Sequence, residues 1–467
     1  MEVSERNVHI MNKKKSADNF YDQDFPRLGI GEDDFIVWQD RNLSDELIKP
    51  KEKSPGMDKP FLVISLVLLI IGLIMVLSAS FARGFYLQSQ PLRLFMRQSA
   101  FAVTGVAIML VTSRISIKII SRFSMQLLLA SIIMLVLVPF IGIRSGGATR
   151  WLGVGGEHGF FSFQPSEIAK LGIILGFAQM ACKIGHNRMK TFKFGVVPFA
   201  IVTGIIIVFL RLQPHLSAII IITAITAIMM FAGGTRLRWF MIAIAILVAM
   251  VSGFIFFQLR AYNPNLEMQD VTAETIRTGV DMRFLGHGNR RINAWLNPDD
   301  NPLGDGFQIR QSLNAVGSGG LLGQGLGQSR QKHLYLPEEH NDYIFAIVSE
   351  ELGFIGAMLI LMLFALLVIR GYWLAMNAND KYGSLITIGI TSLLALQVFL
   401  NVAVVTNLLP ATGISLPLFS YGGTALWIQL TQIGLILSVS REIPAPKPSP
   451  EEKGKREKAL WQDSVKN

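Results

Sequence analysis

The sequence has few charged residues for its length, and this scarcity excludes most soluble folds. Of 467 residues, 16% are charged and 51% are hydrophobic, and the mean hydropathy is +0.43. A soluble protein of this size would need more charge to cover its surface, whereas repeated apolar runs of about twenty residues are typical of proteins that cross a bilayer several times. We therefore expect an all-α polytopic membrane protein.

Cysteine is almost absent, and acidic residues are outnumbered by basic ones. A single cysteine, Cys182, excludes an intramolecular disulfide. The net charge of +10 comes from basic residues in short loops and tails, so we expect no nucleic-acid partner. No cleavable signal peptide is expected either, because residues 1–59 are polar and the first apolar run is long enough to span a bilayer.

Apolar segments divide the chain into a membrane domain and two tails. About ten transmembrane helices are expected, at 60–81, 96–113, 123–141, 165–181, 194–210, 214–232, 238–258, 343–369, 384–408 and 420–440. Together they form a membrane domain at 60–440 with one large loop, 259–342. Residues 1–59 cannot bury a core and are predicted to be a disordered tail, and 441–467 form a basic tail.

Basic residues in the short loops predict the orientation of the chain in the membrane. With ten spans, four short loops and both tails fall on one side, and an excess of Lys and Arg marks the cytoplasmic side. The loops carry Arg114, Lys118 and Arg122; Lys183, Arg188, Lys190 and Lys193; Arg236 and Arg238; and Arg370 and Lys381. Both termini are therefore predicted to be cytoplasmic, and loop 259–342 to be extracytoplasmic.

Asp342 lies where this loop meets an apolar segment. A carboxylate at such a boundary is costly to desolvate, so it is a functional candidate by default. Glu350 and Glu351 follow about 12 Å deeper, at 1.5 Å per helical residue, which is too far for a proton shared with Asp342. Asp342 is therefore interpreted as a solitary base. His340 could relay a proton or bind a metal, but no second His or Cys lies nearby at metal-ligand spacing.

Two further polar features allow both a functional and a structural interpretation. Glu167 and Lys170 are spaced i,i+3 and can pair on one helix face, either in a substrate cavity or as an ion pair that fixes packing. Arginines of loop 259–342 suit pyrophosphate recognition or salt bridges within the loop. The Gly-rich run 317–330 lacks the GK[ST] ending of a phosphate-binding loop, so we expect a flexible loop whose backbone lies close to the membrane surface.

Five blocks of sequence, in order, resemble the SEDS family (shape, elongation, division and sporulation), typified by FtsW, RodA and SpoVE. They are GLIMVLSASF (72–81), GATRWLGVG with FSFQPSEIAK (147–170), RINAWLNPDDNPLGDGFQIRQSLNAVGSGGLLGQGLGQ (291–328), LPEEHNDYIFAIVSEELGFIG (336–356) and LLPATGISLPLFSYGGTAL (408–426). The resemblance covers nearly all of 60–440. It departs at His215 in QPHLSA, where the family has an acid in QPDLGT, and in extra residues near Glu157–Gly159.

The resemblance implies a peptidoglycan glycosyltransferase that polymerises lipid II at the outer face of the bacterial cytoplasmic membrane. It implies a class B penicillin-binding protein as partner, alongside other division or elongation membrane proteins. The family's essential aspartate maps onto Asp342. Candidate substrate-binding residues are Arg150, Glu167, Lys170, Arg291, Gln308, His340 and Glu350. No cofactor is indicated, and a divalent cation is left open.

Two other functions remain compatible with these residues. A lipid II flippase would also use membrane-embedded Glu167, Lys170 and Glu350, although no internal repeat typical of transporters is evident. A non-catalytic scaffold for the penicillin-binding partner would not need Asp342. Within the family, the motifs and polar tails favour a division protein of the FtsW type over an elongation protein of the RodA type.

Overall fold

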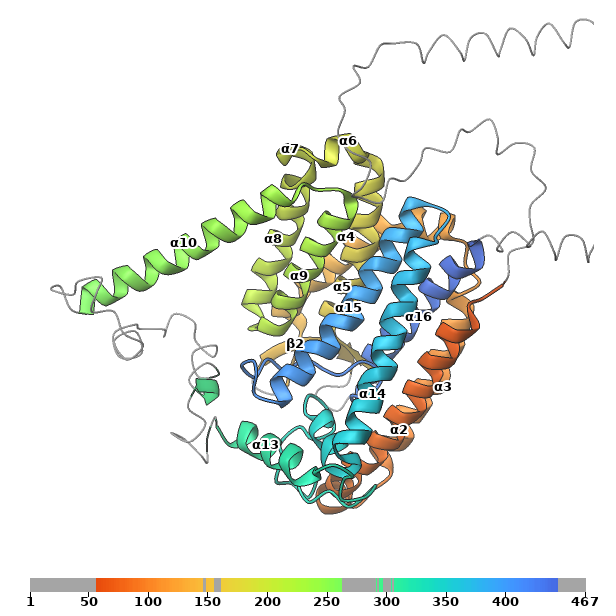
Figure 1. Ribbon diagram of the computed structural model, residues 1–467, viewed down its shortest axis with the longest axis vertical. Coiled ribbons are helices and arrows are strands. Elements are labelled where there is room, and N and C mark those ends of the chain that lie inside the picture. Colours follow the sequence, from red (N-terminus) through yellow and green to blue (C-terminus); the bar gives the residue numbers. More distant parts are fainter. Residues whose placement is uncertain are drawn as a thin grey trace, which may run out of the picture. The chain divides into compact units, whose positions relative to one another are not determined.

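The computed structural model describes residues 56–145, 148–154, 161–262, 291, 294–296, 304 and 306–443. Both predicted tails lie almost entirely outside the described residues, as does most of the part of loop 259–342 that precedes residue 306. The described residues form a helical bundle with one small sheet (Figure 1).

Long helices account for each of the ten expected spans. They are α2 (Lys59–Gln88), α3 (Arg93–Thr112), α4 (Ile117–Ile141), α5 (Pro165–Ile184), α8 (Val197–Leu212), α9 (Leu216–Gly233), α10 (Leu237–Tyr262), α14 (Ile344–Met376), α15 (Lys381–Val405) and α16 (Gly423–Glu442). The shorter helices are α6 (His186–Met189), α7 (Phe192–Gly195) and α13 (Phe307–Gly319). The prediction of an all-α polytopic membrane protein is confirmed.

Fewer helices qualify as membrane spans by length and composition than the ten that were expected. Within the described part of the chain, eight helices are long and apolar enough to cross a membrane. Of the remaining two, α5 carries Glu167, Lys170 and Lys183, and only Leu237–Met250 of α10 qualifies as a shorter apolar helix. A count of ten spans therefore stays a prediction.

A three-stranded antiparallel sheet was not expected from the sequence. Strands β1 (Ile143–Ser145), β2 (Ala148–Val154) and β3 (Phe161–Phe163) pair in the order β1-β2-β3. Strands β1 and β3 have three residues each, too short to show a period of two, and β2 has no strict alternation of apolar and polar residues, which is why hydropathy alone missed the sheet. The sheet fills the connection between α4 and α5, and Pro165 starts α5 directly after it.

Helix α14 is bent at Gly353, whose backbone is left-handed with φ +67°. The backbone N–H groups freed by the bend donate to the Gly-rich segment: Phe354 N to Gly320 O at 2.8 Å and Ile355 N to Leu321 O at 3.1 Å. At Gly323 a Cβ would lie 2.2 Å from Glu351 O, so only glycine allows this approach. The Gly-rich run was predicted to lie close to the membrane surface. The structure shows its close approach to the backbone of α14, and the closeness to the membrane surface stays a prediction.

A buried ionic network joins this bend to α2. The Glu351 carboxylate accepts from Ser78 Oγ at 2.6 and 2.7 Å, from Ser329 N at 3.3 Å and from Lys332 Nζ at 2.9 Å. Glu350 accepts from Ser329 Oγ at 2.5 Å and from the backbone N–H groups of residues 330 and 331. Lys332, Glu350 and Glu351 are each at most 4% exposed. Because every carboxylate has several donors, the network anchors the turns of 329–332 to α14 and α2.

This network generates a stability prediction. Replacing Lys332 with Met leaves the Glu351 carboxylate buried without its cation, which should lower the free energy of unfolding by about 3 kcal/mol. The double variant Lys332→Met/Glu351→Gln should recover most of that loss, because the uncompensated charge is gone. Denaturant unfolding in detergent measures both, and equal destabilisation of the single and double variants would contradict the coupling.

Candidate active site

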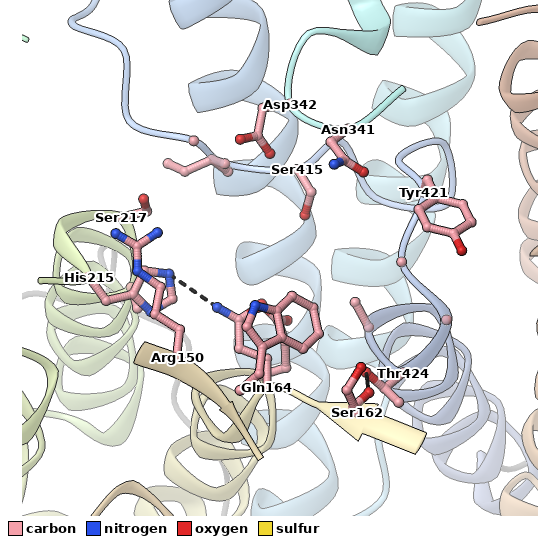
Figure 2. A pocket seen from close by; sticks show the side chains of 18 of the residues that line it. Arg150, Ser162, Gln164, His215, Ser217, Asn341, Asp342, Ser415, Tyr421 and Thr424 are labelled. Carbon is pink, nitrogen blue, oxygen red and sulfur yellow. Dashed lines mark hydrogen bonds between the residues drawn. The ribbon is translucent and has the colours of Figure 1, made fainter. Parts of the chain in front are cut away.

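A polar cavity of about 410 Å³ lies among the sheet, α9 and the segments that precede α14 and α16. Its lining includes three basic and two acidic residues, Arg97, Arg150, Lys170, Glu167 and Asp342. Figure 2 shows Arg150, His215 and Gln164 together in one part of the cavity and Tyr421, Thr424 and Ser162 in another. The cavity therefore draws its polar groups from segments far apart in the sequence.

Asp342 reaches this cavity from the turns just before α14. Burial, and after it the nearby Glu338, raises the pKa of its carboxyl group, while Arg291, His340 and Arg150 lower it; the net pKa is about 6. The facing wall is Gly413, where a Cβ would lie 3.1 Å from Asp342 Oδ2. A carboxylate with this pKa is mostly ionised at pH 7 and can still accept a proton, as a general base must.

Arg150 is held at the cavity by β2 and by the segment that follows α8. Its guanidinium donates to Gln213 O at 3.4 Å and to Pro214 O at 2.6 Å. Burial and the nearby Arg291 lower its pKa, whereas Asp342 raises it. Because a guanidinium keeps its proton in proteins, Arg150 supplies a fixed positive charge near Asp342.

Glu167 and Lys170 form the ion pair that their spacing predicted. Lys170 Nζ lies 2.7 Å from Glu167 Oε1 in the first turns of α5. Both side chains line the cavity; that of Glu167 is 12% exposed and that of Lys170 is 4% exposed. The pair lies beside the cavity, so Lys170 can contact a ligand while Glu167 holds it in place.

His215 contributes a neutral group to the same wall. Burial, together with the charges of Arg150, Lys170 and Arg291, lowers its pKa to about 3. Gln164 Nε2 lies 3.3 Å from His215 Nε2, so the amide donates to the neutral ring. A carboxylate here would offset the charge of Arg150, and a neutral imidazole does not.

The other predicted substrate-binding residues do not line this cavity. Arg291 Nη1 donates to Ala411 O at 3.1 Å, two residues before Gly413, and its charge lowers the pKa of Asp342. Gln308 donates to Pro337 O. His340 is buried, with its ring centroid 5.7 Å from that of Tyr421. Glu350 lies in the ionic network at the bend of α14.

Several cavity residues were not singled out from the sequence. They are Arg97, Ser162, Gln164, Ser217, Gln397, Tyr421 and Thr424. Most lie inside or beside quoted blocks, such as FSFQPSEIAK and LFSYGGTAL, but uncharged polar residues give no desolvation signal of their own. Only the folded arrangement identifies them.

Metal ligation has no support from side-chain clustering. Among the described residues, no group of three or more His, Cys, Asp or Glu side chains could hold a metal ion. A divalent cation that arrived with a substrate would therefore find no such set of described ligands.

The sequence is similar to known proteins over most of its length. The family model for cell cycle proteins of the FtsW, RodA and SpoVE type matches residues 59–444. Stage V sporulation protein E of Bacillus subtilis (strain 168) is 39% identical over 393 residues, covering 84% of this chain and 98% of that protein. A protein named probable peptidoglycan glycosyltransferase FtsW, from Geobacter metallireducens, is 36% identical over 392 residues, covering 82% of this chain and 94% of its own.

Solved structures share the fold. One chain, from a structure described as the coordination of polymerization and crosslinking by a peptidoglycan synthase complex, aligns with a TM-score of 0.65 and 24% identity over 84% of this chain and 100% of that chain. Rod shape determining protein RodA of Thermus thermophilus aligns with a TM-score of 0.57 and 23% identity, covering 84% of this chain and 99% of its own.

The raised pKa of Asp342 predicts a change in stability that does not depend on any activity. Above about pH 6 the folded protein carries a buried carboxylate that the unfolded chain would solvate, so Asp342→Asn should stabilise the fold by at most about 3 kcal/mol. Between about pH 6 and pH 4 the gain should shrink, because the folded wild type becomes protonated. Thermal unfolding across this range measures it, and a variant less stable than wild type at pH 8 would contradict the shift.

Proposed function

Because the chain belongs to the FtsW, RodA and SpoVE family of cell cycle proteins, we propose that it is a peptidoglycan glycosyltransferase that polymerises lipid II. The observation that carries this proposal is the carboxylate of Asp342, with a pKa near neutrality, at a cavity that also holds Arg150 and Lys170. A base beside fixed positive charge suits the transfer of a sugar from a diphosphate carrier.

In the proposed reaction Asp342 accepts the proton of the acceptor sugar's 4-hydroxyl. The oxygen of that hydroxyl forms a bond to the anomeric carbon of the donor sugar while the bond from that carbon to the lipid diphosphate breaks. Attack and departure occur on opposite faces, so the configuration inverts in one displacement. One base is enough, because a diphosphate needs charge stabilisation more than it needs a proton.

Fixed cations would supply that charge stabilisation. Arg150 is held by two backbone carbonyls and Lys170 by Glu167, so neither has to reorganise as charge develops on the diphosphate. A preorganised donor of this kind contributes about 3–4 kcal/mol to transition-state stabilisation. Arg291 does not line the cavity, and we assign it to the electrostatic balance of Asp342.

The position of Asp342 along the fold supports a polymerase over a transporter. It precedes the first residue of α14, at one end of the helix, whereas transporter sites lie near the middle of the bilayer. We propose that this end faces the outside of the bacterial cytoplasmic membrane, with both termini in the cytoplasm. We also propose a class B penicillin-binding protein as partner, which would cross-link the new strand.

The biological role within the family is proposed from the relatives in hand. Proteins named FtsW and a sporulation protein match over more than four-fifths of this chain at 36% and 39% identity. We favour septal peptidoglycan synthesis of the FtsW type over sidewall elongation. Fluorescent localisation in growing cells decides between them, since a sidewall pattern would assign the chain to elongation.

Replacing Asp342 with Asn tests the proposed activity. Loss of the base should reduce polymerisation of lipid II by the purified protein about 10²–10⁴-fold while the protein stays folded. Liposomes with labelled lipid II separate the rival functions. A flippase would move lipid with Asp342→Asn, a scaffold would support normal growth with it, and full polymerisation by the variant would end the assignment of the base.

The pH dependence of polymerisation tests the environment of that base. The rate should fall about tenfold per pH unit below about pH 6, because protonated Asp342 cannot accept a proton. Glu338→Gln removes a negative charge that raises this pKa, so its acid limb should move to lower pH. If the acid limb of the pH–rate profile does not move in Glu338→Gln, a group other than Asp342 controls that limb.

A further inference from the structure

Three consecutive backbone carbonyls around Asp342 are each held by a hydrogen bond from the C-terminal part of the chain. His340 O accepts from Tyr421 N at 2.9 Å, and Asn341 O accepts from Ser420 Oγ at 2.8 Å. Asp342 O accepts from Asn401 Nδ2 at 2.7 Å. The segment that presents the carboxylate lies in turns, outside any helix, so these bonds fix its backbone.

The facing wall of the cavity is held in the same way. Ala411 O accepts from Arg291, Thr412 O accepts from Ser217 Oγ, and Ile414 O accepts from Asn401 Nδ2 at 2.7 Å. Between them lies Gly413, with φ +73° and its Cα hydrogens facing Asp342 Oδ2. The gap between this wall and Asp342 therefore depends on how the two segments are joined.

Asn401 joins them. It lies on α15 and is 1% exposed, and its one amide nitrogen donates both to Asp342 O and to Ile414 O. Two hydrogens on one nitrogen can serve two carbonyls at once, which a hydroxyl cannot do. Its Oδ1 is buried and accepts no hydrogen bond from the described residues, so the two bonds from Nδ2 alone hold the amide in place. Loss of either bond would leave a buried N–H unpaired, which is costly.

We propose that Asn401 is a positioning residue that sets the distance between the Asp342 carboxylate and the Gly413 wall. The inference rests on the glycosyltransferase function proposed above and adds a residue that does not line the cavity itself. A base must stay within about 0.5 Å of its productive position, and a misplacement of about 1 Å can cost about 100-fold in rate. Asn401 acts through backbone carbonyls, so its loss should affect turnover and leave substrate binding intact.

The test compares Asn401→Ala with Thr387→Val. Thr387 lies on the same helix, is fully buried and donates to Gly383 O within that helix, so its variant also loses a buried hydrogen bond. We expect Asn401→Ala to lower kcat for lipid II polymerisation about 10- to 100-fold with KM changed less than about threefold. Thr387→Val should keep the wild-type kcat. A kcat loss no greater than that of Thr387→Val, or a rise in KM alone, would overturn the proposal.

A second measurement does not require activity. Backbone hydrogen exchange in peptides covering 338–343 and 411–416 should increase in Asn401→Ala and stay at the wild-type level in Thr387→Val. Unchanged exchange in these peptides would show that Asn401 does not hold the two segments together. Faster exchange with unchanged kcat would show that Asn401 holds them but does not position the base for catalysis.

These outcomes are separable from failure of the proposed function. If wild-type protein does not polymerise lipid II, the proposed function is wrong. If Asp342→Asn polymerises it fully, only the assignment of the base is wrong. In both cases hydrogen exchange still decides whether Asn401 joins the two segments. Should Asn401→Ala fail to fold, Ser420→Ala removes the bond that Ser420 Oγ donates to Asn341 O and the bond that it accepts from Leu416 N. Ser420→Ala should cause a smaller loss in kcat than Asn401→Ala, with unchanged KM. A wild-type kcat in Ser420→Ala would overturn the proposal that these backbone bonds position the base.

Discussion

The site depends on keeping one carboxylate ionised at the edge of an apolar bundle. Burial and the nearby Glu338 raise the pKa of Asp342, and the charges of Arg291, His340 and Arg150 limit the rise to about 6. Neither arginine forms a hydrogen bond to the carboxylate in this structure: each is anchored to backbone carbonyls instead, Arg150 on Pro214 and Arg291 on Ala411. Charge compensation from a distance leaves the carboxylate oxygens available to a substrate hydroxyl.

Asp342 and Glu350 lie close together in the sequence, but their carboxylates differ in the hydrogen-bond donors around them. Asp342 has its backbone held and its carboxylate facing a cavity. Glu350, eight residues on, has its carboxylate hydrogen-bonded by Ser329 Oγ and two backbone N–H groups, and it does not line the cavity. Glu350 therefore anchors the turns that lead to Asp342, and Asp342 carries the chemistry in the proposed reaction.

Sequence patterns predicted the features that depend on local composition. Each apolar run became a helix because burial in lipid requires the backbone to satisfy itself locally. Asp342 was found because an acid at a membrane boundary is costly wherever the rest of the chain lies. The bend at Gly353, the strand pairing around Arg150 and the placement of Gln308 could not be predicted, because each depends on contacts with distant segments. Asn401 was missed for the same reason, since an uncharged amide in an apolar helix has no signal until its two acceptors are known.

The charge balance of the cavity suits the order of events in the proposed reaction. Three basic and two acidic side chains line it, and His215 adds none because its imidazole is neutral. When Asp342 takes the proton of the acceptor hydroxyl, one of the two negative charges of the lining disappears. At that moment the leaving diphosphate gains negative charge, and Arg150 and Lys170 face it with less competition from the protein. Proton transfer to the base thus strengthens the attraction that the departing group experiences, so a single carboxylate can assist both the bond that forms and the bond that breaks.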